Sequence, residues 1–309
     1  MSDVDPSTGS GHRLATALAG MHLPSPVLTA AGCGGRELAP FTDLAALGAV
    51  VSRTVTLDAQ AGSPPPRVAE TPSGLLHATG AQNPGLQGFL ATELPWYGQQ
   101  GVRAIVSISA GTLAEYGELA RRLATASGVS AVEVHLAVPD AYQTGKVLQV
   151  VRRDLPRGTT LLAKLAPGGD VVDQARAAVD NGADAVVLCQ GFPALVLDPT
   201  TLRPVLGAGG GLLSGPAVHA LALRCVWDVH AALPDVPVVG VGGIRSGFDA
   251  LAMLLAGATA VQLGSVLLRD PSAATRIRHE LVAELDRRDL KSAADAVGLA
   301  HQQPEGSSR

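Results

Sequence analysis

Eight short apolar runs recur along this chain of 309 residues, and they constrain its fold more than any other feature. Most of each run is continuously apolar instead of alternating, and several runs are rich in β-branched side chains. A strand has this pattern when both of its faces are buried, as in a parallel sheet. The runs span residues 27–31, 49–56, 104–110, 131–137, 160–166, 185–191, 236–243 and 260–265.

Amphipathic segments separate most of these runs. Apolar residues at helical spacing predict helices over 113–126, 171–182, 247–258 and 272–288. Eight strands that alternate with helices favour an α/β fold with a single TIM (β/α)8 barrel, which needs about 250 residues. An open, doubly wound parallel sheet is the alternative at this stage, because one strand more or less would change the topology.

We expect one barrel domain over residues 13–300, with flexible polar tails at 1–12 and 301–309. Residues 57–85 contain the string PPPR and further prolines. They predict a loop excursion on top of the barrel, and long ordered loops of this kind usually serve a binding site.

Composition excludes several functional classes. With 47% hydrophobic and 16% charged residues the chain is globular, and a net charge of −4 offers no basic surface for nucleic acid. The acidic, polar N-terminus does not resemble a signal peptide, and no apolar run reaches the roughly 18 residues of a membrane span. Three cysteines, Cys33, Cys189 and Cys225, lack metal-ligand spacing. We therefore expect a cytoplasmic protein with reduced thiols and no metal, which acts on a small molecule.

Glycines gather at the ends of the last predicted strands. The seventh strand ends in Gly242-Gly243, the eighth ends in Gly264-Ser265, and Gly209–Gly211 with Ser214 and Gly215 precede a predicted helix. Barrels often bind phosphate after strands 7 and 8, where backbone N–H groups and helix N-termini face the anion. Tight turns that need positive φ are the alternative reading of any one glycine pair. Three clusters together favour a phosphate site.

Lys164 interrupts the apolar run of the fifth predicted strand. A buried strand does not keep an ammonium group without a partner, because its desolvation costs several kcal/mol. Three roles are open to Lys164 here. It could stabilise negative charge on a reduced flavin, form a Schiff base with a carbonyl substrate, or belong to a structural ion pair.

Longer strings resemble the dihydroorotate dehydrogenase family, and its soluble FMN-containing class in particular. The similarity covers most of 20–290 and is clearest in segments 52–85, 210–229 and 236–265, where PPPR, QNPG and LSGPA are together specific. The resemblance implies a flavin-dependent oxidoreductase acting on a CH–CH bond, with the family reaction dihydroorotate to orotate in pyrimidine biosynthesis. It also implies a homodimer and, in one subclass, an electron-transfer partner subunit.

The resemblance carries over position by position. The residues that it assigns to FMN are Ala31, Gly32, Arg53, Thr54, Ser107, His135, Lys164, Gly215, Gly242, Gly243, Gly264 and Ser265. The residues that it assigns to the substrate are Arg53, His77, Gln190 and Gly191.

The sequence departs from the family at the catalytic base. Soluble members use a cysteine after the fourth strand, and Val138 occupies that position within HLAVPD. Valine cannot accept a proton, and loss of a general base typically slows a reaction by about 10²–10⁴-fold. The following segment, AYQTG, predicts a loop shortened against the family pattern.

Four family asparagines that hold the orotate ring are also replaced, by His77, His135, Asp140 and Gln190, and a family lysine has become Arg53. Imidazole and carboxylate groups cannot reproduce the donors and acceptor of an amide. We therefore expect an altered substrate. The candidate catalytic groups are His77, His135 and Asp140, which suit acid–base work near neutral pH, and Lys164, which the resemblance places near the flavin ring.

Two other functions compete with this one. A phosphate-sugar aldolase or isomerase barrel would use Lys164 as a Schiff base. A catalytically silent FMN-binding paralogue or partner subunit would keep the cofactor without turnover. Cys189, beside Gln190, and Cys33, beside Gly32, are either reactive thiols or inert buried residues.

Overall fold

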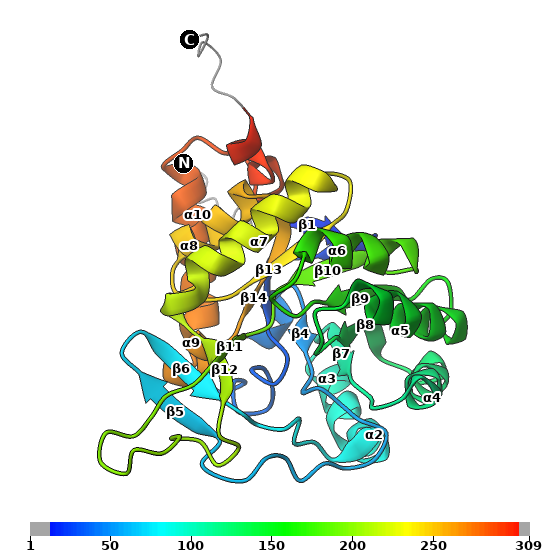
Figure 1. Cartoon of the computed structure of the whole chain (residues 1–309). Helices are drawn as coiled ribbons and strands as arrows, with labels where there is room; N and C mark the ends of the chain where they lie inside the picture. The colour runs from blue at the N-terminus through cyan, green and yellow to red at the C-terminus, as the bar shows by residue number, and fades with distance from the viewer. Residues whose placement is uncertain (1–12, 303–309) are drawn as a thin grey trace.

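A computed structural model describes residues 13–302 of the chain; the expected tail at 1–12 and residues 303–309 lie outside this part. Within it, eight strands form one parallel sheet, surrounded by helices (Figure 1). In sheet order the strands are β3 (Val27–Thr29), β14 (Ala258–Leu263), β13 (Val238–Val241), β10 (Ala185–Leu188), β9 (Thr160–Lys164), β8 (Val129–His135), β7 (Ala104–Ile108) and β4 (Val50–Val51).

The two edge strands of this sheet, β3 and β4, lie side by side and close it into a barrel. The backbone N–H of Thr29 donates to Ala49 O at 3.3 Å, and that of Gly32 donates to Ser52 O at 3.3 Å. The hydroxyl of Thr29 accepts a further hydrogen bond from the N–H of Val51 at 3.1 Å. The predicted TIM barrel is confirmed, and the open doubly wound sheet is excluded.

The helices follow the strands as a barrel requires. They are α2 (Gly85–Gly88), α3 (Leu94–Gln99), α4 (Leu113–Ala124), α5 (Ala141–Asp154), α6 (Val171–Asp180), α7 (His219–Ala232), α8 (Gly247–Leu255), α9 (Ser265–Arg269) and α10 (Ala273–Asp286), with a π-helical segment at Phe89–Glu93 between α2 and α3. The four helices predicted from periodicity correspond to α4, α6, α8 and α10. Side-chain caps fix where three of them start, at Thr112, Asp170 and Ser246.

One local prediction was wrong. The string AYQTG begins α5 and is therefore helical, not a loop. Asp140 caps this helix by accepting a hydrogen bond from the backbone N–H of Gln143 at 2.7 Å. The N-cap interaction lets the helix begin immediately after Asp140, so the connection from β8 consists of residues 136–140 alone.

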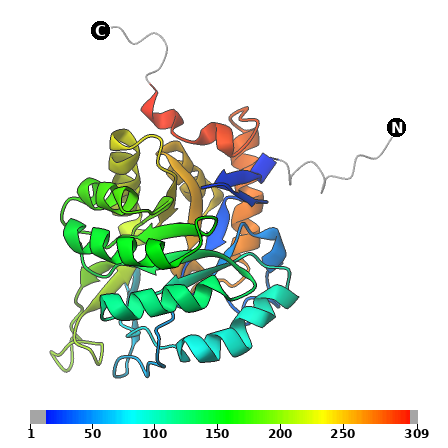
Figure 2. The same cartoon turned by 90° about the vertical axis from the view of Figure 1, so that its right-hand side faces the viewer.

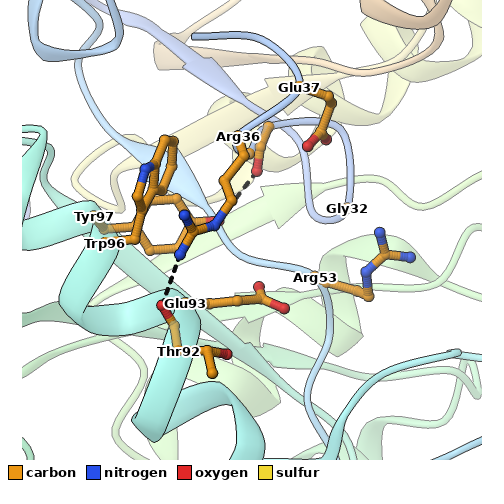
Figure 3. A pocket seen from close by; sticks show the side chains of 10 residues that line it. Gly32, Arg36, Glu37, Arg53, Thr92, Glu93, Trp96 and Tyr97 are labelled. Atoms are coloured by element: carbon orange, nitrogen blue, oxygen red, sulfur yellow. Dashed lines mark hydrogen bonds between the residues drawn. The ribbon is translucent and has the colours of Figure 1, made fainter.

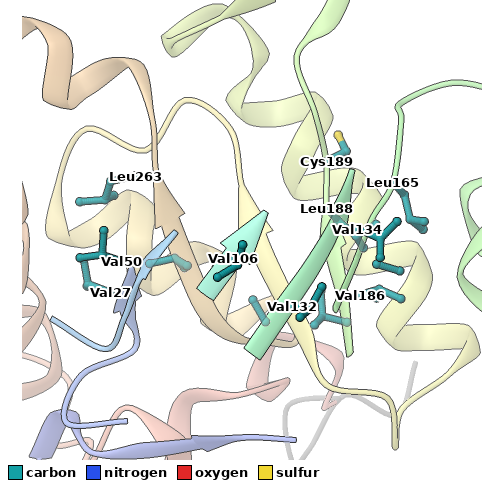
Figure 4. Packing of buried hydrophobic residues seen from close by; sticks show 14 of the residues in the cluster. Val27, Val50, Val106, Val132, Val134, Leu165, Val186, Leu188, Cys189 and Leu263 are labelled. Atoms are coloured by element: carbon teal, nitrogen blue, oxygen red, sulfur yellow. The ribbon is translucent and has the colours of Figure 1, made fainter. Parts of the chain in front are cut away.

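Side chains on the barrel strands alternate between two cores, because successive residues of a strand point to opposite faces. Val106, Val132 and Val134 belong to the outer core against the helices (Figure 4). Ile105 and Ala131 belong to the inner core, together with Leu18 and Leu23 of a hairpin formed by β1 (Thr16–Leu18) and β2 (Met21–Leu23). The same alternation directs Ser107, Glu133, His135, Lys164 and Gln262 toward the inside of the barrel.

The predicted excursion at 57–85 carries β5 (Val68–Thr71) and β6 (Gly74–His77). They join β12 (Gly211–Ser214) and β11 (Phe192–Ala194) in an antiparallel sheet of order β11-β12-β6-β5. This sheet lies beyond one end of the barrel, and the β1–β2 hairpin lies toward the other end (Figures 1 and 2). Gly211 is the first residue of β12, so Gly209–Gly211 lead into this sheet rather than to the tip of a barrel strand.

Other parts of the described chain bear on earlier expectations. His301, which we expected in the C-terminal tail, ends a 3₁₀ turn at Leu299–His301, and its ring stacks on Trp227 with 3.6 Å between centroids. Among residues 13–302, none of the helices has the length and apolar character needed to cross a membrane.

The β1–β2 hairpin contributes large apolar side chains to the inner core, and Leu18 is fully buried. We predict that Leu18→Ala lowers the free energy of unfolding by about 2–5 kcal/mol, because the cavity cannot close between rigid strands. Leu221→Ala, at an exposed position of α7, should change it by less than about 0.5 kcal/mol. Urea unfolding of both variants measures the difference, and equal stabilities would show that the hairpin does not support the barrel.

Candidate functional site

A glycine-lined cradle of about 60 Å³ lies where β10, β12, β13 and β14 end. Its lining includes Gly215, Gly242, Gly243, Gly264 and Ser265. Gly215, Gly242 and Gly243 have φ angles of 91°, 138° and 65°, which side chains with a Cβ rarely adopt. A Cβ added to Gly243 would lie 2.7 Å from Gly215 O, so the two turns fit only as glycines.

The cradle also presents backbone donors. Gly243, Gly264 and Ser265 are half-buried, and their backbone N–H groups are not donors in the backbone hydrogen bonds of the turns and loops of residues 13–302. Backbone N–H groups that lack a protein acceptor can bind a ligand, and several of them around one cavity suit an oxyanion. The lining therefore fits the phosphate predicted from the sequence.

A polar group of three side chains crosses the interior of the barrel. Lys164 Nζ donates to Gln262 Oε1 at 3.0 Å and lies 3.6 Å from Glu133 Oε1. Gln262 Nε2 donates to Glu133 Oε2 at 2.6 Å, and all three residues are buried. Lys164 thus has the carboxylate partner that a buried ammonium requires. The structural ion pair, one of the three roles open at the sequence level, is present.

His135 and Gln190 extend this group toward the mouth of the barrel. His135 is paired in register with Lys164 on the neighbouring strand. Gln190 Nε2 donates to Leu136 O at 2.5 Å, which holds the Gln190 amide beside the end of β8. Burial, and secondly the positive charge of Lys164, lower the pKa of His135 to about 4. His135 is therefore neutral near pH 7.

His77 approaches from the four-stranded sheet. A Cβ on Gly191 would lie 3.5 Å from the Cε1 atom of His77, so the imidazole lies against the end of β10. Burial lowers the pKa of His77, and its Nδ1 atom is buried without a partner in the described part of the chain. The structure thus brings His77, Gln190 and Gly191 together, as the resemblance implied.

Segments after β3 and β4 form the opposite side of the mouth. Thr54 Oγ1 and the buried Ser107 Oγ are 3.0 Å apart, and the N–H of Ser107 donates to Ser52 Oγ at 3.0 Å. Gly32 has a φ of 76° and follows Ala31 directly. Arg53 is exposed at this edge.

An outer cleft of about 270 Å³ continues from Gly32 and Arg53 to the surface, and sequence analysis did not identify it. Arg36 covers the ring of Trp96, with 5.0 Å between the guanidinium carbon and the ring centroid (Figure 3). Tyr97 Oη donates to Gly34 O at 3.1 Å and ties α3 to the segment after β3. Glu37, Glu93, Arg36 and Arg53 make the cleft strongly polar.

Two predicted positions lie apart from these groups. Asp140 is exposed and its carboxylate caps α5. Val138 has 60% of its surface exposed, in the connection after β8. Neither residue is among those lining the cradle or the outer cleft.

The two cysteines near the site are poor nucleophiles. A hydrogen bond with Cys225 and burial raise the pKa of Cys189, and burial raises the pKa of Cys33. Thiols with raised pKa values stay protonated near neutral pH. The inert reading of both residues is favoured.

Comparison with known proteins identifies the family. A sequence model of the family described as Dihydroorotate dehydrogenase matches residues 13–285. The chain belongs to the dihydroorotate dehydrogenase family.

Proteins named dihydroorotate dehydrogenase B (NAD(+)), catalytic subunit, are similar over almost their whole length. Two of these relatives are 41% identical: the protein from Citrifermentans bemidjiense, covering 92% of this chain and 97% of that one, and the protein from Desulforudis audaxviator, covering 94% and 98%. The relative from Anoxybacillus flavithermus is 37% identical, covering 93% of this chain and 96% of its own. These relatives support an oxidoreductase of the dihydroorotate dehydrogenase type.

Sequence reasoning missed two members of the buried polar group. Glu133 and Gln262 interrupt the apolar runs at 131–137 and 260–265, as Lys164 interrupts 160–166. Three polar interruptions at inward-facing positions of barrel strands were a usable signal that they pair with one another. Trp96 and Tyr97 of the outer cleft gave no such signal, because aromatic residues in a helix are usually core.

The ion pair generates a first prediction for this site. Glu133→Leu should lower the free energy of unfolding by about 3–5 kcal/mol, because it leaves the Lys164 ammonium group buried and without its carboxylate partner. Adding Lys164→Met should recover part of the loss. Urea unfolding of the single and double variants measures the coupling, and simple additivity of the two single losses would contradict the pairing.

The lowered pKa of His135 generates a second prediction, which concerns how stability depends on pH. The folded-state pKa of about 4 lies below the ordinary value of 6.5, so the neutral form contributes stability that is complete above pH 6.5 and is lost as the pH falls toward 4. The contribution is at most about 3 kcal/mol. His135→Gln should therefore lose less stability than the parent between pH 7.5 and pH 4.5 in urea unfolding. An equal loss in both proteins would mean that His135 is not buried as a neutral imidazole.

Proposed function

We propose that this chain is an FMN-dependent oxidoreductase of the dihydroorotate dehydrogenase type. The observation that carries the proposal is that one barrel contains both a glycine-lined cradle at the ends of β13 and β14 and the buried ammonium group of Lys164. The glycine cradle suits a phosphate group, and Lys164 suits an electron-rich ring. Both lie at the carboxyl ends of strands in one barrel.

The chain offers a complete set of groups for FMN. Gly215, Gly242, Gly243, Gly264 and Ser265 would hold the phosphate through their backbone N–H groups. Lys164 and His135 would lie against the flavin ring, and Ala31, Gly32, Arg53, Thr54 and Ser107 would line its remaining edges. When bound, FMN supplies the acceptor for hydride transfer from a substrate C–H bond.

The substrate would occupy the space between His77, Gln190, Gly191 and Arg53. Arg53 supplies a cation for an anionic substrate, and Gln190 supplies an amide that is already oriented by Leu136 O. His77 supplies a neutral imidazole, since burial lowers its pKa. His77 and His135 are then the groups able to accept a proton from substrate, and Asp140, which caps α5, would act only if that cap opened.

We infer that dihydroorotate is turned over slowly and that another small unsaturated or carbonyl-bearing substrate is preferred. The resemblance places Val138 at the position of the family base, and valine has no proton acceptor. A site that recognises its substrate by hydrogen bonds can lose about 10⁴-fold in specificity when those pairs fail. The replaced asparagines and the missing base therefore both lower the expected rate of dihydroorotate turnover.

Reconstitution with FMN tests the cofactor. Purified protein should bind FMN and show the visible absorption bands of a flavin, whereas a preparation that never takes up FMN would sink the proposal. Borohydride trapping of a phosphorylated carbonyl compound on Lys164 would instead support the Schiff-base alternative. The contacts of Lys164 Nζ with Gln262 and Glu133 favour a structural role for this side chain over that alternative.

Replacing Val138 tests the missing base. We predict that Val138→Cys raises the rate of anaerobic flavin bleaching by dihydroorotate, by up to about 10². Val138→Ser is the matched control, since its hydroxyl is a poor base, and it should stay near the parent rate. Stopped-flow absorbance measures all three proteins. Rapid bleaching of the parent protein would show that another residue already serves as base.

The names of the relatives bear on partners. Each is called a catalytic subunit, and we propose that this chain too works with a second, electron-transferring subunit and forms a homodimer. The silent flavin-binding alternative predicts binding of FMN without bleaching by any donor in a substrate panel, with or without such a subunit.

A further inference from the structure

His219, the first residue of α7, contacts one of the glycine turns that line the cradle. Its Nδ1 atom is 3.0 Å from Gly242 O. Because a carbonyl oxygen can only accept, Nδ1 carries the proton in this contact. The backbone of His219 also touches the turn, since a Cβ on Gly243 would lie 2.9 Å from His219 N.

Asp249 of α8 lies behind the imidazole. Its Oδ1 atom is 3.8 Å from His219 Nε2, and its Oδ2 atom accepts hydrogen bonds from the backbone N–H of Arg245 at 2.8 Å and from Arg245 Nε at 3.1 Å. Burial acts to raise the pKa of Asp249, but the hydrogen bonds from Arg245 and the charge of His219 outweigh it, so the net pKa is lowered. The turn after β13 is therefore held from two helices.

The hydrogen bond from His219 also sets the direction of a donor. A peptide bond is planar and trans, so the C=O of Gly242 and the N–H of Gly243 point in opposite directions. By holding Gly242 O, His219 turns the Gly243 N–H to the other side. That N–H is one of the backbone donors of the cradle.

We propose that His219 is a positioning residue that orients the turn at Gly242-Gly243 for a phosphate group. The inference rests on the proposed FMN site and adds a residue that does not touch the cofactor. It requires that replacement of His219 weaken FMN binding through the phosphate alone, because the flavin ring would lie against other residues.

Two flavins that differ only by the phosphate separate this role from a general effect on the fold. FMN and riboflavin are titrated into flavin-free protein, and flavin fluorescence reports each dissociation constant. His219→Leu should weaken FMN binding by about tenfold, as expected for one lost hydrogen bond, and should leave riboflavin binding unchanged. His219→Asn, whose amide nitrogen can replace Nδ1, should restore most of the FMN affinity. His22→Leu, at an exposed residue of β2, is the matched control and should behave as the parent.

Each outcome decides a different point. Equal weakening of FMN and riboflavin by His219→Leu, or no weakening of either, would overturn the role of His219 while the proposed function stands. If His219→Asn does not recover FMN affinity, the hydrogen bond to Gly242 O is not what orients the turn. If the parent protein binds neither flavin, the proposed function itself fails and takes this inference with it.

Discussion

The pairing of Lys164 with Glu133 through Gln262 is the interaction on which the organisation of the barrel interior depends. An ammonium group inside a barrel costs several kcal/mol unless an anion compensates it, and Glu133 on the adjacent strand supplies that anion. Gln262 reaches the pair from β14 and joins it by two hydrogen bonds. The fixed positions of these three side chains divide the barrel into an apolar end, near the β1–β2 hairpin, and a polar mouth.

This division decides where chemistry can occur. Toward the hairpin the inner face carries residues such as Leu18, Ile105 and Ala131, which have no polar groups to offer. At the mouth, His135 and Gln190 lie one step beyond the buried group, and the glycine cradle lies beside them at the ends of β13 and β14.

The barrel strands and part of the glycine cradle could be predicted from the sequence, for identifiable reasons. Continuous apolar runs gave all eight strands, because parallel strands buried on both faces are mostly apolar. The cradle residues Gly242, Gly243 and Gly264 were found because their position after the last strands and their lack of a Cβ are both visible in sequence. Gly209–Gly211 were misassigned, since glycine composition alone does not distinguish a strand tip from the start of β12. The partners of Lys164 were missed although Glu133 and Gln262 interrupt their apolar runs in the same way. The outer cleft at Trp96 and Tyr97 depends on tertiary proximity, which spacing along one chain does not report. The contact of His219 with Gly242 is hidden for the same reason.

The small antiparallel sheet has a consequence for how this enzyme could diversify. His77 is held opposite Leu212 by the register of β6 and β12, two strands far apart in the chain, while the barrel contributes Gln190 and Gly191 independently. Substitutions or short insertions along residues 192–198 would therefore move the imidazole of His77 without changing the barrel strands. The imidazole of His77 and the glycine turns after β13 and β14 are carried by different sheets, so either can change by mutation while the other is preserved.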